Sequence, residues 1–327
     1  MNSKILRISL LLVSLSLAIL TNAQAQDEPY RVVAYFSSYS IYDLDYFVTD
    51  INPENVTHIN YRPFTVSENG QCITTDEWAD TGYLYPGDDE FDRVRGNVHQ
   101  LQMMRGDFPD LKLIMSVGGW ELSRYFSDVA LDEASRLRFA KSCIALLRNY
   151  DFDGIDIDWR YPVVGGAEPI NARSADTDNY VQLLKTLREE LDKAGDQDER
   201  RYILTALIPS SQALYEYYDL NAMHPYLDWL NVATYGYTGA WSEEASPHAP
   251  LSQSPRDPRS DVQREIYNID GTVNAFLDAG VPANKIVMGV GFYAQTWSNV
   301  RQNDIFGLYE SASGIPTGTR PNGILYY

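Results

Sequence analysis

Seven short apolar runs, rich in β-branched residues, alternate with longer segments of helical periodicity along this chain. The runs occupy residues 31–36, 55–61, 111–117, 153–158, 202–208, 229–235 and 285–293. Segments 132–149, 176–194 and 271–280 repeat apolar residues at the spacing of helices. Strand followed by helix, repeated, predicts an α/β fold with parallel strands and helices outside them. The length suits one large domain, because single-domain α/β barrels commonly need around 250 residues.

Segment 176–194 has the pattern expected of a helix that covers a sheet. Asp176 or Thr177 can cap its start, and Gly195 follows its predicted end. Its apolar stripe consists of Tyr180, Leu183, Leu184, Leu187 and Leu191. We therefore expect this helix to lie on the sheet with the stripe buried.

The first 25 residues have the order of a secretory signal peptide. Lys4 and Arg7 precede the apolar run ISLLLVSLSLAIL, and Ala23-Gln24-Ala25 supplies the small residues of a cleavage site. The run is shorter than the roughly 20 apolar residues that a bilayer crossing needs. The sequence predicts cleavage after Ala25 and a secreted or periplasmic product.

The chain is strongly acidic. Its 45 Asp and Glu against 26 Lys and Arg give a formal net charge of −19, and losing two positive residues with the signal peptide would make it −21. Such a charge disfavours nucleic acid and anionic membranes as partners. A neutral partner, or solubility alone, fits this surface better.

Cys72 and Cys143 are the two cysteines of the chain. So few cysteines predict neither a disulfide framework nor a Cys/His metal site. Cys143 lies among apolar residues at helical spacing, which favours a buried small side chain over a bridge to Cys72.

The run DFDGIDIDWRYP, residues 151–162, places acids and an arginine on one face of a strand. Alternate side chains of a strand share a face, so Asp156, Asp158 and Arg160 point the same way, at a rise of about 3.3 Å per residue. Two neighbouring carboxylates in an apolar strand perturb each other's protonation. The residues alone allow a functional site or a structural polar cluster at the end of a barrel.

The run DGIDIDWRYP resembles the active-site strand of glycoside hydrolase family 18, the chitinases and chitinase-like lectins, whose pattern is DxxDxDxE. Other runs resemble further strands in the family's order: VVAYF the first, THINY the second, MSVGGW the third, LDWLNVATYGY the sixth and AGVPANKIVMGVGFY the seventh unit. Together they cover roughly residues 31–297.

This resemblance implies a TIM (β/α)8 barrel over residues 26–299, with its site at the carboxyl ends of the strands. Residues 300–327 resemble the start of a small α+β insertion, and no counterpart of the eighth strand follows. The resemblance therefore predicts a barrel truncated after its seventh strand. A fragment, a partner chain that completes the sheet and a decaying gene all remain open.

The family's chemistry, as the resemblance implies it, is retaining and substrate-assisted. A glutamic acid protonates the glycosidic oxygen while the substrate's own N-acetyl carbonyl attacks the anomeric carbon. By position, Asp158 would orient the acetamide, with Asp156 and Asp153 behind it, and Tyr235 would bond the acetamide carbonyl. The nucleophile belongs to the substrate, so no metal or organic cofactor is implied.

The family's proton donor falls on Arg160. A guanidinium does not release a proton at neutral pH, and it places positive charge where positive charge develops. Glu168, the nearest downstream acid, lies off the strand in a Gly-rich loop. Arg160 can instead pair with Asp158 and neutralise it.

Other sugar-contacting positions of the family also differ. The family's sixth strand reads MTYDxxG, and here Ala233 and Gly236 stand at its Met and Asp positions. Gln295 stands where the family has a sugar-contacting Arg. Phe64 is counted among the candidate sugar contacts by its resemblance to the family's second-strand Phe, although a displacement by one residue would turn its ring off the family's face.

Several aromatic residues at or just beyond strand ends can stack on sugar rings. They are Tyr35, Trp120, Tyr161, Tyr235, Trp241 and Trp297. Ordinary core packing is the competing interpretation, and it is the one expected for Trp159, which faces away from Asp158 and Arg160.

Three functions follow from these features. The main prediction is a secreted protein that binds chitin or chito-oligosaccharides with hydrolysis lost or severely impaired. The alternatives are an active chitinase that hydrolyses β-1,4 N-acetylglucosamine linkages, and a decayed product without a ligand. The oligomeric state is not predicted.

Overall fold

Within residues 30–89 and 95–316, seven parallel strands form one sheet in the order β1-β2-β4-β5-β6-β7-β8. The computed structural model also describes residues 318 and 323–326. The strands are β1 Val33–Ser37, β2 His58–Val66, β4 Lys112–Gly118, β5 Gly154–Asp158, β6 Ile203–Pro209, β7 Trp229–Ala233 and β8 Ile286–Met288. Strand β3 Cys72–Thr74 pairs antiparallel with β2, and β9 Tyr293–Gln295 pairs with β10 Ile324–Tyr326 in a second sheet.

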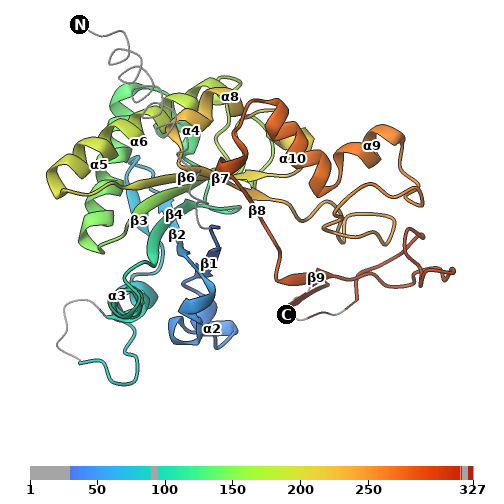
Figure 1. The fold of residues 1–327 in the computed structure, drawn as a ribbon, viewed down its shortest axis with the longest axis horizontal. Helices are drawn as coiled ribbons and strands as arrows, with labels where there is room; N and C mark the ends of the chain where they lie inside the picture. The colour runs from blue at the N-terminus through green and yellow to red at the C-terminus, as the bar shows by residue number, and fades with distance from the viewer. Residues whose placement is uncertain (1–29, 90–94, 317, 319–322, 327) are drawn as a thin grey trace, which may run out of the picture. The chain divides into compact units, whose positions relative to one another are not determined.

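Helices join the strands and cover the sheet, and α5 and α6 lie side by side on one side of it (Figure 1). The α-helices are α2 Ser40–Asp43, α3 Gly96–Asp107, α4 Phe126–Ala130, α5 Glu133–Asn149, α6 Asp176–Asp198, α7 Gln212–Tyr215, α8 Leu220–Met223, α9 Asp261–Ile266 and α10 Ile269–Asp278. Shorter 3-10 turns occupy Val48–Asp50, Pro53–Asn55, His224–Tyr226 and Ala283–Lys285, and Trp78–Gly82 is a π-helix.

The sheet curls far enough for side chains of distant strands to meet. The Tyr35 hydroxyl of β1 donates to Asp156 Oδ2 of β5 at 3.0 Å, although β2 and β4 lie between them. At the other end of the strands, the rings of His58 on β2 and Trp229 on β7 contact edge to face, with centroids 4.8 Å apart. Such contacts belong to a barrel interior, and the predicted order of seven TIM-barrel strands is confirmed.

The main core lies between the sheet and its helices. Trp159, just after β5, is fully buried, and its ring stacks on Phe126 of α4 with centroids 5.5 Å apart. It also contacts Tyr180 of α6 at 4.9 Å. The prediction that Trp159 faces the core is confirmed, and so is the burial of the α6 stripe.

The end of α6 differs from the prediction. The helix continues through Gly195 to Asp198, and Glu199 takes the left-handed conformation that ends it, with φ 53°. Gly195 has another role, since a Cβ there would lie 2.3 Å from the carbonyl oxygen of Arg200. The predicted cap is also corrected: Asp176 is the first helical residue, and its carboxylate accepts from Ser127 Oγ at 2.6 Å.

The two cysteines lie close together as buried free thiols on β3 and α5. Burial, followed by the neighbouring Cys72 thiol, raises the pKa of Cys143. The burial predicted for Cys143 is confirmed.

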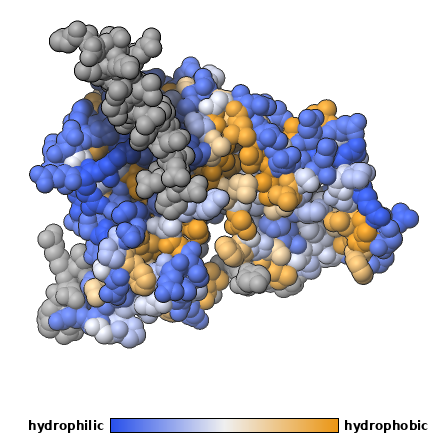
Figure 2. Space-filling view, viewed as in Figure 1, coloured by the Kyte–Doolittle hydropathy of each residue, from blue (hydrophilic) through white to orange (hydrophobic). Residues whose placement is uncertain are grey.

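One edge of the main sheet is apolar. Met288 of β8, and Val290 and Phe292 after it, are more than half exposed. Figure 2 shows hydrophobic surface in the middle of the view, in the region of β8 and α10, with hydrophilic surface to either side. No helix in the described part of the chain has the length and apolar character needed to cross a bilayer. The predicted signal peptide lies outside the described residues.

Candidate functional site

Charged and aromatic side chains gather where β5 and its neighbours end. Asp158 is the last residue of β5, Arg160 and Tyr161 follow it, Trp120 follows β4 and Tyr235 follows β7. We call these five residues the strand-end site. The loops at the carboxyl ends of barrel strands are where TIM-barrel proteins build their sites.

Asp158 and Arg160 form a two-pronged ion pair. Arg160 Nε donates to Asp158 Oδ1 at 2.6 Å, and Nη2 donates to Oδ2 at 3.1 Å. The Asp158 side chain is 1% exposed and that of Arg160 is 24% exposed. Burial disfavours the guanidinium charge, but the Asp158 carboxylate outweighs burial and raises the pKa of Arg160. The predicted pairing is confirmed, and both oxygens of Asp158 are occupied.

Asp156 lies deeper in the barrel interior and is fully buried. Its Oδ2 accepts from Tyr35 Oη at 3.0 Å and from Ser116 Oγ at 2.8 Å. Its Oδ1 accepts from Thr205 Oγ1 at 2.6 Å and from Asn231 Nδ2 at 3.1 Å. Burial raises the pKa of Asp156, and the Thr205 hydrogen bond only partly opposes it. Asp156 therefore joins β5 to four other strands beneath the strand-end site.

Asp153 lies at the opposite end of β5. Its carboxylate forms ion pairs with Arg105 Nη1 at 3.2 Å and with Arg200 Nη2, and it accepts from the Leu113 amide at 2.8 Å. Asp158 lies five positions further along the chain, at a rise of about 3.3 Å per residue. The prediction that placed Asp153 in the catalytic group is corrected, because its partners hold it at the amino end of the sheet.

Aromatic side chains flank the ion pair. Trp120 is 49% exposed and meets Tyr161 edge to face, with ring centroids 5.8 Å apart. Tyr235 is partly buried and contacts Tyr293 in the same manner at 6.0 Å. Burial raises the pKa of both Tyr161 and Tyr235. These rings offer apolar faces beside polar groups, which is the composition of a sugar site.

The sequence of residues 31–327 matches the family described as Glycosyl hydrolases family 18. The chain belongs to this family. It is 36% identical over 323 residues to Chitinase A1 of Niallia circulans, in a match that covers 89% of this chain and 46% of that protein. The family 18 chain thus spans about half the length of this relative.

Solved chitinase structures share the fold of this family 18 chain. Chitinase ChiA74 from Bacillus thuringiensis superposes with a TM-score of 0.82 at 31% identity, over 91% of this chain and 52% of that one. The catalytic domain of the psychrophilic chitinase B from Arthrobacter TAD20 gives 0.83 at 26% identity, over 90% and 78%.

Phe64 departs from the sugar contact predicted for it. The register of β2 against β4 shifts between Tyr61 and Phe64, as the displacement by one residue in the sequence suggested. The ring is fully buried and packs edge to face on Tyr61 and Phe152. The predicted sugar contact is corrected to a core contact.

The remaining predicted residues lie in different parts of the fold. Tyr35 lies on β1 and donates to Asp156, and Ala233 ends β7. Gly236 has φ 75°, and a Cβ there would meet no atom within 4 Å. Gln295 and Trp297 line a cavity of about 400 Å³ whose described lining includes no member of the strand-end site.

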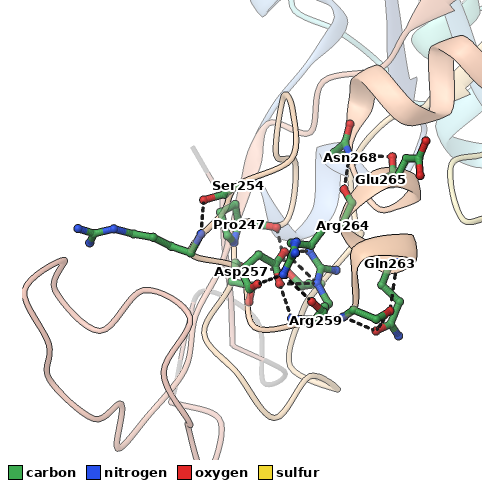
Figure 3. A network of polar contacts seen from close by, with 12 residues as sticks. Pro247, Ser254, Asp257, Arg259, Gln263, Arg264, Glu265 and Asn268 are labelled. Atoms are coloured by element: carbon green, nitrogen blue, oxygen red, sulfur yellow. Dashed lines mark hydrogen bonds and ion pairs between the residues drawn. The ribbon is translucent and has the colours of Figure 1, made fainter.

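Trp241 lies on the loop between β7 and α9 and is 68% exposed. A network centred on Asp257 and Arg259 holds this loop (Figure 3). Arg259 Nε donates to both Asp257 oxygens at 3.0 Å, and Arg264 Nη1 donates to the carbonyl oxygens of Asp257 and Arg259 at 3.0 and 2.9 Å. Burial would raise the pKa of Asp257, but Arg259 keeps it below its usual range.

Arg62 of β2 is the residue that the sequence analysis did not assign to the site. A Cβ placed on Gly119 would lie 2.9 Å from Arg62 Nη2 and 3.8 Å from Asp158 Oδ2, so Arg62 reaches the strand-end site. The feature of the sequence that could have identified Arg62 is its charge within the otherwise largely apolar strand β2. In the described part of the chain, no group of His, Cys, Asp and Glu has an arrangement that could hold a metal ion.

Proposed function

We propose that this family 18 protein binds chitin or N-acetylglucosamine oligosaccharides, with hydrolysis lost or severely impaired. The observation that carries the proposal is the ion pair between Asp158 and Arg160. By resemblance, the family's proton donor would stand at position 160, and a guanidinium cannot supply the proton. The same pair occupies the carboxylate that would orient the substrate's acetamide.

Other side chains near the ion pair are poor substitutes for the missing acid. Glu168 is exposed, and its Oε2 accepts from the Ile170 amide at 3.3 Å within its own loop. Tyr161 and Tyr235 have pKa values raised by burial, so their phenols hold their protons at neutral pH. A general acid must also lie within hydrogen-bond reach of the scissile oxygen.

Binding is supported by the aromatic rings that remain. Trp120 presents half its surface beside Tyr161, and Tyr35, in the middle of β1, is 36% exposed. Flat rings of this kind stack on pyranose faces without any need for acid catalysis. The signal-peptide pattern of residues 1–25 adds the proposal that the protein acts outside the cytoplasm.

The purified protein should melt at a higher temperature with chitohexaose and release no fluorophore from a fluorogenic chitobioside. A ligand bound only by the folded state raises the midpoint by mass action, whereas turnover needs the proton donor. The control for hydrolysis is the heat-killed protein. Hydrolysis above that control, abolished by Asp158→Asn, would favour an active chitinase instead. A cooperative melt without any shift would remove chitin as the ligand.

Arg160→Glu alone should leave turnover of the chitobioside undetectable. The change restores an acid at the position, but Ala233, Gly236 and Gln295 still differ from the sugar-holding residues of the family, so the substrate stays poorly positioned. The measurement is fluorophore release by the variant against the unchanged protein. Appearance of chitinase activity on this single change would contradict the account.

A further inference from the structure

Arg62 carries a guanidinium that forms no ion pair with an acid in the described part of the chain. Its Nη1 lies 3.4 Å from Ser37 Oγ and 3.3 Å from Tyr39 Oη, which are long for hydrogen bonds. Its Nε is buried and has no hydrogen-bond partner among the described residues. Among those residues, no aspartate or glutamate forms an ion pair with it. Donors withdrawn from water in this way cost free energy unless a ligand accepts from them.

Of the cations that the structure describes at the strand-end site, Arg62 is the one without an ion pair. Arg160 is matched by the Asp158 carboxylate, and Asp156 is enclosed by its own four donors. Arg62 Nη2 and Asp158 Oδ2 both lie within 4 Å of the position that a Cβ on Gly119 would take. Burial raises the pKa of Tyr235, and the charges of Arg160 and Arg62 both oppose that rise, so both guanidinium groups act on one hydroxyl.

We propose that the strand-end site selects a sugar that carries a carboxylate, with Arg62 as its ion-pairing residue and Trp120 and Tyr161 against the pyranose ring. The proposal rests on the proposed function, because it takes the same site to hold an N-acetylated oligosaccharide. A planar guanidinium matches a carboxylate through two parallel hydrogen bonds. The carbonyl of a neutral acetamide offers no opposite charge, so it gains less from Arg62.

The test is calorimetric titration of the full chain with three tetrasaccharides. One alternates N-acetylglucosamine with glucuronic acid, the second is the same compound with its carboxyl groups reduced to alcohols, and the third is chitotetraose. We expect the acidic compound to bind roughly ten-fold more tightly than its reduced form at low salt. The advantage should shrink near 1 M salt, where the screening length falls to about 3 Å.

Arg62→Gln is the test variant, and Arg138→Gln is its matched control. Arg138 is exposed on α5, so its loss changes the net charge equally without touching the site. We expect Arg62→Gln to abolish the preference for the acidic compound over its reduced form. Arg138→Gln should behave as the unchanged protein. A cooperative melt of each variant checks folding.

The outcomes separate this inference from the proposed function. Equal binding of the acidic and reduced compounds, with chitotetraose bound, would overturn the carboxylate preference and leave the chitin proposal standing. Binding of the acidic compound alone, lost on Arg62→Gln, would support the inference and remove chitin as the ligand. A preference that survives Arg62→Gln would overturn the role of Arg62. If none of the three binds, both proposals fail.

Discussion

Asp156→Ala should lower the free energy of unfolding by about 3 kcal/mol. The substitution removes one acceptor that four donors share, and Ser116, Thr205 and Asn231 are each at most 5% exposed. A buried donor without an acceptor costs about 1–3 kcal/mol. The total cost of the unpaired donors is smaller than their number suggests, because the Asn231 amide can donate to Thr205 Oγ1, already 3.5 Å away. Removing the carboxylate also removes the cost of burying it. Urea denaturation monitored by tryptophan fluorescence measures the change.

Two variants serve as controls for Asp156→Ala. Asp156→Asn keeps one acceptor oxygen and should lose about half as much stability, since its amide nitrogen cannot accept from the remaining donors. Asp110→Ala removes an exposed carboxylate and should change the free energy of unfolding by less than about 0.5 kcal/mol. Equal stabilities of Asp156→Ala and the unchanged protein would mean that Asp156 does not join the strands as described.

The parts of the site predictable from sequence are those set by local periodicity. The alternation of a strand placed Asp156, Asp158 and Arg160 on one face and Trp159 on the other, and the structure has this arrangement. The ion pair followed from the same alternation, because residues two apart on a strand lie side by side. No knowledge of distant segments was needed for these features.

The parts that the sequence could not predict depend on distant segments. The fate of Asp153 is decided by Arg105 and Arg200, which lie 48 and 47 residues away in the chain. The position of Arg62 depends on a register shift in β2 and on its approach to Gly119. The periodicity of a segment carries no information on its contacts with distant segments. The sequence analysis therefore assigned all the acids of the motif to the catalytic group, although they lie at opposite ends of a strand.

The register shift in β2 also shows why a family resemblance transfers residue roles imperfectly. Phe64 matched an aromatic position in the resemblance, yet the shift buries its ring against Phe152. The same stretch brings Arg62 to the strand-end site. One local change in backbone register therefore removes an aromatic surface and adds a cation.

Asp80 is a buried acid outside the strand-end site, in the π-helix Trp78–Gly82. It is 1% exposed, and its two oxygens accept from the Tyr61 hydroxyl and the Thr74 hydroxyl. Burial raises the pKa of Asp80 to about 6, although both hydrogen bonds oppose the rise. An unfolded aspartate has a pKa of about 3.9. The folded state therefore holds this proton more tightly than the unfolded state does.

The protein should lose about 3 kcal/mol of stability through Asp80 as the pH rises from about 3 to 7, at about 1.4 kcal/mol for each pKa unit. Below about pH 3 both states bind the proton and the contribution is complete. Between pH 4 and 6 the unfolded state releases it first, so unfolding becomes easier. Asp80→Asn has no proton to release, and its stability relative to the unchanged protein should rise over this range in urea denaturation. Asp110→Asn, at an exposed position, should show a constant difference, and a constant difference for Asp80→Asn would contradict the raised pKa.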